Sequence, residues 1–244
     1  MNPGPGSTQP TAAASAEADA AAVSQRGPSW LVLLGVALLV MLVVRGLFVQ
    51  SFYVPSGSME PAIEPGDRIL VNKMAGAGDL RRGDVVVFDG STSFATADRT
   101  PAWSEGVIGR TLSGAASLFG VDLGEQDFVK RIVGLPGDRV VCCDGEGRVT
   151  VNGTPVDEDY LRPGSSPSET TFDVTVPAER LWVLGDNRAD SADSRAHLGN
   201  PGGGMVRVSD VIGRAAATYW PLSRLGGFSP PPALSSIPRA AGAS

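Results

Sequence analysis

The sequence predicts a mainly β domain of antiparallel sheet, preceded by a single apolar helix. Three observations support this fold class: one long apolar run near the N-terminus, a series of short β-branched runs after it, and turn signals between those runs. The chain has 244 residues, of which 42% are hydrophobic, so it can form the core of one mid-sized domain.

The N-terminal part divides into two segments. Residues 1–29 are rich in Pro, Gly, Ser and Ala, bury too little surface to offset their ordering entropy, and are expected to be disordered. Residues 30–49, WLVLLGVALLVMLVVRGLFV, would span about 30 Å as a helix, which is the thickness of a bilayer's hydrocarbon core. We therefore expect a transmembrane anchor at residues 30–49.

A cleaved export signal is the alternative for this run. Such signals have an apolar region of about 7–15 residues and then a small-x-small site. The run here is longer and no Ala-x-Ala follows it directly, which favours a retained anchor. Trp30, Phe52 and Tyr53 stand where interfacial aromatic side chains are expected. Arg26 and Arg45 flank the run on opposite sides, so the positive-inside rule does not decide its orientation.

The strand-like runs predict one domain at residues 50–225. They occur at residues 68–71, 85–88, 128–133, 171–176, 181–184 and 211–212. The sequence VTVNGT at 149–154 predicts a β-hairpin with a type I′ turn.

Three further segments fit the strand pattern poorly. Residues 89–127 and 145–179 are interpreted as inserts, the first with a helix near 107–118 and the second forming a small accessory β region. Residues 226–244 are rich in Gly, Pro, Ala and Ser and are expected to form a flexible tail.

Composition excludes several kinds of site. The net charge is −6 and no basic stripe with interleaved aromatics occurs, so nucleic-acid binding is not expected. One His, His197, and two cysteines cannot form a zinc site of ordinary ligand count and spacing, and no phosphate-binding glycine loop occurs, so no metal or cofactor is expected. A disulfide between the neighbours Cys142 and Cys143 would be strained, which favours two thiols near a hairpin.

The first candidate catalytic segment is VPSGSMEP at residues 54–61. Its two prolines bracket Ser56-Gly57-Ser58, which favours a turn of fixed conformation, although a turn serine is more often a hydrogen-bonding loop residue than a nucleophile. Ser58 lies nine residues after Val49, so even an extended chain keeps it within about 30 Å of the anchor's end. A substrate for Ser58 would itself be membrane-bound.

The second candidate segment is FVKRIVGLPGD at residues 128–138. On a strand, Lys130 shares a face with Phe128 and Ile132, whereas Arg131 points the other way. If that face is inward, burial lowers the lysine pKa from about 10.4, and a neutral amine can take a proton from a serine hydroxyl. The alternative is an edge-strand lysine that reaches water, and this segment alone favours that alternative.

The third segment is GDNRADSADSR at residues 185–195, directly after the apolar run 181–184. It holds three Asp, two Arg and two Ser. A solvated loop is one interpretation, but this density of opposite charges after a core strand favours a hydrogen-bonded network packed on the core.

Together the segments resemble the bacterial type I signal peptidases, or leader peptidases, over nearly all of residues 30–222. The resemblance is carried by PSGSMEP at 55–61, GDRILVNK at 66–73, RRGDVVVF at 81–88, VKRIVGLPGD at 129–138 and GDNRADSADSR at 185–195. Each segment alone is weak, but five in this order are specific. The resemblance implies a catalytic domain of the signal-peptidase and repressor-protease type.

The resemblance also implies roles for individual residues. Ser58 would be the acylating nucleophile and Lys130 the general base. The Ser58 N–H and the Ser56 hydroxyl would form the oxyanion hole, and Ser191 would orient the lysine amine. Ion pairs behind the site are implied for Arg131, Asp186, Asp193 and Arg195, and Met59 is expected near the substrate pocket. The family has Asp-Asn before the orienting serine, whereas this chain has Ala189-Asp190.

The implied function is that of a membrane-bound serine endopeptidase that removes signal peptides from secreted preproteins after Ala-x-Ala sites. Its implied partners are signal peptides, the lipid bilayer and the neighbouring protein-export channel. The implied location is the bacterial cell membrane, with one span, a cytoplasmic N-terminus and an extracytoplasmic catalytic domain. Lysine rather than histidine at position 130 is similar to the prokaryotic type.

Other functions are distinguishable from this one. Self-cleaving repressor-type Ser/Lys proteases have a similar catalytic fold but carry a DNA-binding module, whereas this chain has an apolar anchor and an acidic balance. A β-lactamase-type site is excluded because no Ser-x-x-Lys or Lys-Thr-Gly occurs. A membrane-tethered binding domain would leave Ser58 and Lys130 unrelated, with more than about 5 Å between hydroxyl and amine.

Overall fold

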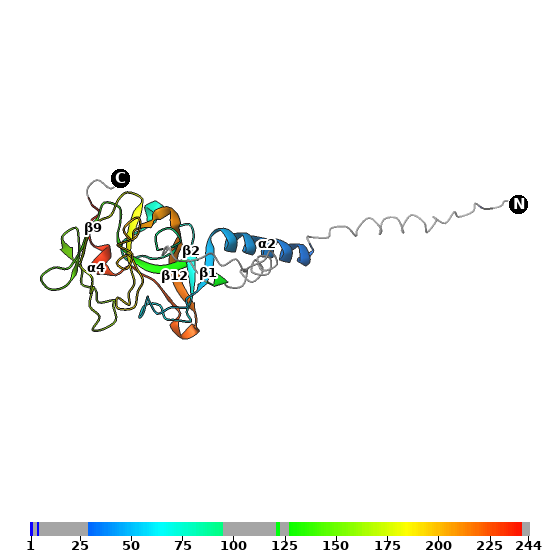
Figure 1. The fold of residues 1–244 in the computed structure, drawn as a ribbon. Helices are drawn as coiled ribbons and strands as arrows, with labels where there is room; N and C mark the ends of the chain where they lie inside the picture. The colour runs from blue at the N-terminus through cyan, green and yellow to red at the C-terminus, as the bar shows by residue number, and fades with distance from the viewer. Residues whose placement is uncertain (2–3, 5–28, 95–120, 123–126, 241–244) are drawn as a thin grey trace, which may run out of the picture. The chain divides into compact units, whose positions relative to one another are not determined.

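The structure is a computed structural model that describes residues 1, 4, 29–94, 121–122 and 127–240 (Figure 1). The chain forms two compact units, Met1–Arg45 and Gly46–Ser244. Helix α2 covers Trp30–Leu47, a segment of straight-chain and β-branched apolar residues with few helix breakers. Within the described part of the chain, no helix combines the length and the apolarity that a membrane crossing requires. The anchor expected at residues 30–49 stays a prediction.

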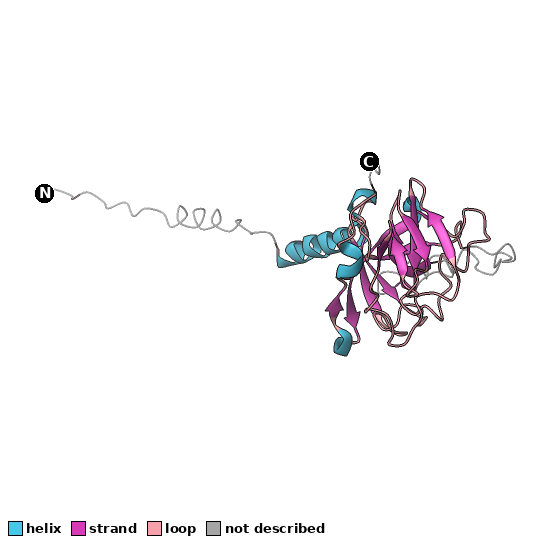
Figure 2. Ribbon diagram, turned by 90° about the vertical axis from the view of Figure 1, so that its left-hand side faces the viewer, coloured by secondary structure: helices cyan, strands magenta, loops and turns pink. Residues whose placement is uncertain are grey.

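The second unit contains a large sheet in which the described strands follow the order β11-β10-β5-β3-β12-β2-β1-β4, with β13 paired to β12. Figure 2 draws the strands in magenta. The strands are β1 (Val49–Tyr53), β2 (Arg68–Asn72), β3 (Val85–Asp89), β4 (Val121–Asp122), β5 (Asp127–Gly134), β10 (Arg180–Leu184), β11 (Val206–Arg207), β12 (Val211–Trp220) and β13 (Gly226–Gly227). Only the pairing of β1 with β4 is parallel among these described strands. The predicted antiparallel fold class is thus confirmed.

A small second sheet has the order β8-β7-β6-β9. Its strands are β6 (Arg139–Cys142), β7 (Val149–Val151), β8 (Thr154–Pro155) and β9 (Phe172–Thr175). Asn152 and Gly153 join β7 to β8 with φ of 55° and 79°, the positive values that the expected type I′ turn requires. This sheet is the accessory β region, but it starts before residue 145 because β6 belongs to it.

The remaining described helices are short. They are η1 (Ala77–Asp79), η2 (Val208–Asp210), η3 (Leu222–Arg224) and α4 (Pro232–Ser235). The helix expected near residues 107–118 lies outside the described residues.

Strand β12 is much longer than the predicted run at 211–212. Its central residues Ala215–Ala217 have low strand propensity, so the pattern ended early. The strand continues because β12 lies between β3 and β2, and backbone hydrogen bonds on both edges hold it extended.

Buried side chains form three hydrophobic clusters. One fills the space beside the small sheet, a second contains Phe52, Met59 and Val129, and a third contains Phe88, Phe94 and Ile132. The interfacial position expected for Phe52 is therefore wrong: its side chain is 0% exposed, because β1 pairs with β2 and turns Phe52 into the core.

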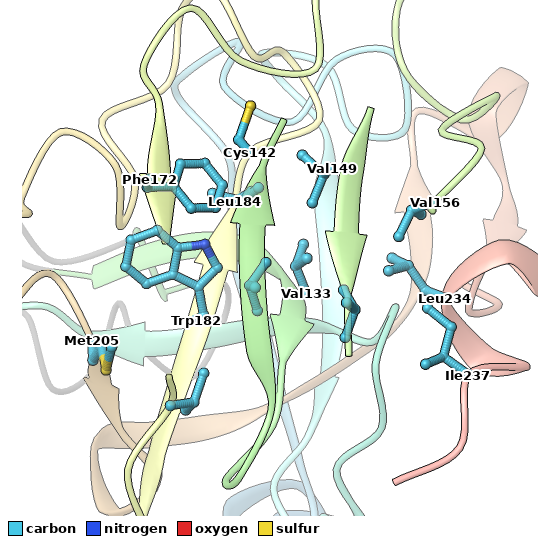
Figure 3. Packing of buried hydrophobic residues seen from close by; sticks show 13 residues of the cluster. Val133, Cys142, Val149, Val156, Phe172, Trp182, Leu184, Met205, Leu234 and Ile237 are labelled. Atoms are coloured by element: carbon cyan, nitrogen blue, oxygen red, sulfur yellow. The ribbon is translucent and has the colours of Figure 1, made fainter. Parts of the chain in front are cut away.

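The flexible tail expected at residues 226–244 is also wrong as far as residue 240. Leu234 and Ile237 are 0% and 5% exposed and pack with Val133 and Val156, as Figure 3 shows. Arg82 donates hydrogen bonds to the carbonyls of Ile237 and Pro238, at 2.6 and 3.1 Å. Two apolar anchors in a Pro-rich segment suffice to dock it on the core.

The two cysteines also differ from expectation. Cys142 and Cys143 form a disulfide between sequence neighbours instead of two free thiols. They lie where β6 ends, so the alternation of a strand no longer separates their side chains.

Candidate active site

Ser58 lies in the tight turn that follows β1. Two hydrogen bonds close the base of this loop, from the Val54 N–H to the Asp67 carbonyl at 2.9 Å and from the Gly66 N–H to the Val54 carbonyl at 2.8 Å. The Glu60 N–H donates to the Gly57 carbonyl at 3.1 Å, across the turn that contains Ser58. This turn holds the Ser58 side chain, which is largely buried, at a fixed place.

Asn187 fixes the same turn from the other side. Its N–H donates to the Ser58 carbonyl and its Nδ2 to the Gly57 carbonyl, both at 3.1 Å. The Ser58 N–H, in contrast, donates to no acceptor in the described part of the chain. That N–H is therefore available to an external oxygen.

Lys130 reaches Ser58 from strand β5, which lies between β10 and β3. Its Nζ donates to the Ser58 Oγ at 2.7 Å, although the two residues are 72 positions apart. This distance is well inside the limit of about 5 Å beyond which the two side chains would be unrelated. The geometry thus argues against a binding domain in which Ser58 and Lys130 have separate roles.

Burial changes the acidity of Lys130. Loss of solvent lowers its pKa from 10.5 to about 8, against the opposing effect of the Asp193 and Asp186 carboxylates. The amine also donates to the Val129 carbonyl at 2.9 Å and lies 5.9 Å from the centre of the Phe128 ring. A substantial fraction of the amine is therefore neutral in mildly alkaline solution.

Arg131 follows Lys130 on β5 and forms a buried ion pair with Asp186. Its Nε donates to Oδ1 at 2.8 Å and its Nη2 to Oδ2 at 2.5 Å. Nη1 donates to the Gly83 carbonyl at 2.7 Å, and the guanidinium lies 4.9 Å from the centre of the Tyr160 ring. Although burial opposes the charge, the bonds to Asp186 outweigh it and raise the Arg131 pKa.

Asp193 and Arg195 form the second expected pair. The Arg195 Nε and Nη2 donate to the two carboxylate oxygens at 2.9 and 2.8 Å, and the Gly185 N–H donates to Oδ2 at 3.0 Å. Burial disfavours the carboxylate, but Arg195 and the Gly185 N–H outweigh it and keep the Asp193 pKa below its usual range. A fixed negative charge thus lies close to the lysine.

The two supporting serines differ from each other. Ser56 is exposed, and its Oγ lies 3.4 Å from the Ser58 Oγ. Ser191 lies beside Gly185, where an added Cβ would clash with both its side chain and the Ser58 carbonyl. The buried Ser191 Oγ has no hydrogen-bond partner of normal geometry among the described residues, Lys130 included, but it lies close enough to the Asp193 carboxylate to help lower its pKa. The Lys130 amine donates instead to the backbone carbonyl of Val129, so the orienting role expected for Ser191 stays a prediction.

Arg188 is a site residue that the sequence analysis did not identify. It is buried and donates to the Gly185 carbonyl at 3.0 Å and to the Glu158 carboxylate at 2.8 and 2.5 Å. It thereby ties the accessory region to the segment that carries Asp186 and Asp193. The charge density of that segment was a signal for Arg188, but nothing in the sequence points to Glu158 as its partner.

The described residues contain no group of three or more His, Cys, Asp or Glu arranged to hold a metal ion. What the arrangement can do is proton transfer between a serine hydroxyl and a largely buried amine, next to the Ser58 N–H, which has no acceptor among the described residues.

Comparisons with known proteins found several similar chains. A signal peptidase I of Mycobacterium tuberculosis is 37% identical over 216 residues, 80% of this chain and 73% of that protein. A probable signal peptidase I of Mycobacterium leprae is 39% identical over 206 residues, 73% of this chain and 71% of that protein. A solved signal peptidase I from Enterococcus faecalis V583 matches with 24% identity and a TM-score of 0.34, over 55% of this chain and 95% of that chain.

The family described as signal peptidase, peptidase S26, matches residues 28–220, which include the Ser58 turn, strand β5 and the 185–195 segment. The alignments with the M. tuberculosis and M. leprae relatives cover more than two thirds of the length of each relative. This chain belongs to the signal peptidase I (peptidase S26) family, the serine peptidases that remove signal peptides.

Proposed function

We propose that the chain removes N-terminal signal peptides from secreted preproteins by cutting after small-x-small (Ala-x-Ala) sites through an acyl-enzyme, with Ser58 as nucleophile and Lys130 as general base. The observation that carries this proposal is the 2.7 Å contact between the Lys130 Nζ and the Ser58 Oγ. A lysine with a pKa of about 8 can act as a base where an ordinary lysine is fully protonated.

The proposed reaction starts with proton transfer from the Ser58 hydroxyl to the neutral Lys130 amine. The Ser58 Oγ attacks the scissile carbonyl carbon, and the carbonyl oxygen becomes an oxyanion. The free Ser58 N–H and the nearby Ser56 hydroxyl support an oxyanion hole, because both can donate to that oxygen. The lysine ammonium then protonates the leaving amine. The neutral Lys130 next takes a proton from a water molecule, which hydrolyses the acyl ester on Ser58 and releases the hydroxyl.

The proposed scaffold holds the base and the nucleophile in register. Asp186 and Asp193 form ion pairs with Arg131 and Arg195, which hold both carboxylates in fixed positions. Their remaining field still raises the Lys130 pKa against the effect of burial. The expected orienting role of Ser191 stays a proposal, since its hydroxyl is near the site but not bonded to the amine.

Cleavage of a preprotein by the purified, detergent-solubilised chain tests the catalytic pair. Ser58→Ala and Lys130→Ala should each abolish processing of an Ala-x-Ala preprotein while the domain stays folded. Lys73→Ala is the matched control, because Lys73 is the other lysine of the chain and is exposed. If the Ser58→Ala protein still cuts at the Ala-x-Ala site, the assignment is wrong.

We propose further that residues 30–49 anchor the chain in the bacterial cell membrane, with the N-terminus cytoplasmic and the catalytic domain extracytoplasmic. The family is membrane-associated, and a preprotein in export presents its signal peptide in the same plane, next to the export channel. Protease added to intact spheroplasts should digest residues 50–244 and spare a tag placed before residue 30. Protection of the catalytic domain instead would reverse the topology.

A further inference from the structure

A group of aromatic rings lies behind Lys130 and is not used by the chemistry above. Phe128 is two positions before Lys130 on β5, and its ring is 5.9 Å from the Lys130 Nζ. Phe88, from the paired position on β3, stacks on Phe128 at 5.8 Å. These two rings form the inner layer next to the lysine.

A second layer covers the first. The Phe94 ring meets Phe128 at 5.2 Å and Phe88 at 5.3 Å, both edge to face. His197, from the segment after β10, stacks on Phe94 at 4.3 Å with 19° between the ring planes. Phe94 and His197 are 4% and 9% exposed. Four rings from three separate parts of the chain thus form one aromatic cluster that ends at the lysine.

His197 is an unusual member of this aromatic cluster. Its Nε2 is buried and has no hydrogen-bond partner in the described part of the chain, whereas its Nδ1 lies 3.1 Å from the Asn200 Nδ2. Burial lowers its pKa, and the neighbouring Lys130 lowers it further against the effect of Asp193. Burial and Lys130 both favour the neutral imidazole, whose ring presents a flat face to Phe94.

We propose that Phe94 and His197 are positioning residues whose stacked rings keep water away from the Lys130 amine through Phe128. This inference rests on the proposed function, because it assigns a cause to the basicity of the proposed general base. Neither ring touches the reacting atoms. Their effect is on how much of the amine is neutral at a given pH.

The physical argument is a competition at Lys130. Burial lowers its pKa, while the Asp193 and Asp186 carboxylates raise it. Among the described residues, His197 also interacts with the amine, and burial and Lys130 both favour its neutral form. A cavity opened by loss of the Phe94 ring can admit water toward the amine, which relieves the desolvation and lets the carboxylates dominate. The pKa then moves up toward that of an ordinary lysine.

The test is the pH dependence of kcat/KM between pH 6 and pH 10.5. The full chain in detergent should be given a peptide with an Ala-x-Ala site and no titratable side chain. The acid limb is the part of the profile in which kcat/KM rises with pH as Lys130 loses its proton. Phe94→Ala should move this limb to higher pH by about one unit, which lowers kcat/KM at pH 7 about tenfold and leaves the alkaline plateau in place. His197→Ala should move the limb in the same direction, whereas His197→Phe, which keeps a stacked ring, should not move it.

Phe172→Ala is the matched control, because Phe172 is similarly buried, at 6% exposure, but packs against Trp182 in the cluster beside the small sheet. It should lower the melting temperature without moving the limb. Folded Phe94→Ala with an unmoved limb would overturn the proposal. If Phe94→Ala does not fold, His197→Ala decides alone, and an unmoved limb there overturns it equally. Activity of Lys130→Ala would instead refute the proposed function, so the two failures are distinguishable.

Discussion

Lys130 and Arg131 are consecutive residues of β5, equally buried, yet their surroundings have opposite effects. No carboxylate of the described residues contacts Lys130, and its pKa falls to about 8. Arg131 is held by both oxygens of Asp186, and its pKa rises. Burial opposes the charge in both cases. The difference shows that the direction of the shift depends on whether a fixed partner offsets the loss of water.

The comparison also separates two tasks. A general base must be neutral before it can accept a proton, and the described contacts of the Lys130 amine are a hydroxyl and a carbonyl rather than an anion. A structural cation must keep its charge, so Arg131 has a bidentate partner and a third bond to the Gly83 carbonyl. Side-by-side placement on one strand lets a single sheet supply both.

Replacing Lys130 gives the largest expected effect on activity. Lys130→Arg puts a guanidinium, which stays protonated at any useful pH, where the base must be neutral. Preprotein cleavage should fall by about 10²–10⁴-fold or more. Arg131→Lys leaves the base in place and should keep part of the activity while lowering the melting temperature. Equal activity of Lys130→Arg and wild type would remove Lys130 from the reaction.

The pH profile should show the consequence of leaving Lys130 without an anionic contact. The base works only when neutral, so kcat/KM should rise with pH through an apparent pKa of about 8. At pH 6 it should be about 100-fold below the alkaline plateau, since each unit below the pKa costs about tenfold. Asp193→Asn removes a carboxylate that raises this pKa, so the acid limb should move to lower pH. A shift to higher pH would contradict this account.

Breaking the ion pair between Arg131 and Asp186 should affect stability more than chemistry. Asp186→Ala leaves the buried Arg131 guanidinium without its anion, and removing one partner of such a pair typically costs about 3–5 kcal/mol. Denaturant unfolding of the wild-type and variant proteins measures this difference. Asp190→Ala, in the same segment but exposed, is the control and should leave the transition midpoint unchanged. Equal midpoints for all three proteins would show that the pair contributes nothing.

The smallest effect is expected for an ion pair of similar geometry on the surface. Arg139 donates to both oxygens of Asp173 at 2.8 and 2.5 Å, but both side chains are largely exposed. Water and salt screen this pair, so Arg139→Ala should leave the melting curve unchanged. A clear drop in the melting temperature would mean that geometry, rather than burial, decides the worth of these pairs.

Periodicity predicted much of the fold. Runs of β-branched residues located β2, β3, β5, β9 and β10, and the Asn152-Gly153 turn located the hairpin. Strand β1 was not found, because its sequence VQSFY directly follows the apolar run, and Phe52 and Tyr53 were assigned to the membrane interface. The docked segment around Leu234 was not found either, because its Pro-rich composition hides two apolar anchors.

The site was predicted unevenly for a similar reason. Ser58 and Lys130 stand in distinctive segments, and the resemblance to signal peptidases joined them before any distance was known. Ser191 was expected at the amine, but the lysine bonds to the Val129 carbonyl, a group of its own strand. The sequence could not predict Glu158 as the partner of Arg188, because Glu158 follows a strand of the small sheet and Arg188 follows a strand of the large one.

The sequence by itself determined the residue types that the chemistry needs, the alternation that puts Lys130 on a face with Phe128, and the family. Those properties are local or depend on motif order, so they can be obtained without coordinates. Only the tertiary structure decided that Ser58 and Lys130 touch, that Arg131 is neutralised while Lys130 is not, and that Phe94 and His197 stack behind the base. These depend on which distant segments pack together, and burial and partnership, which set acidity, exist only after that packing.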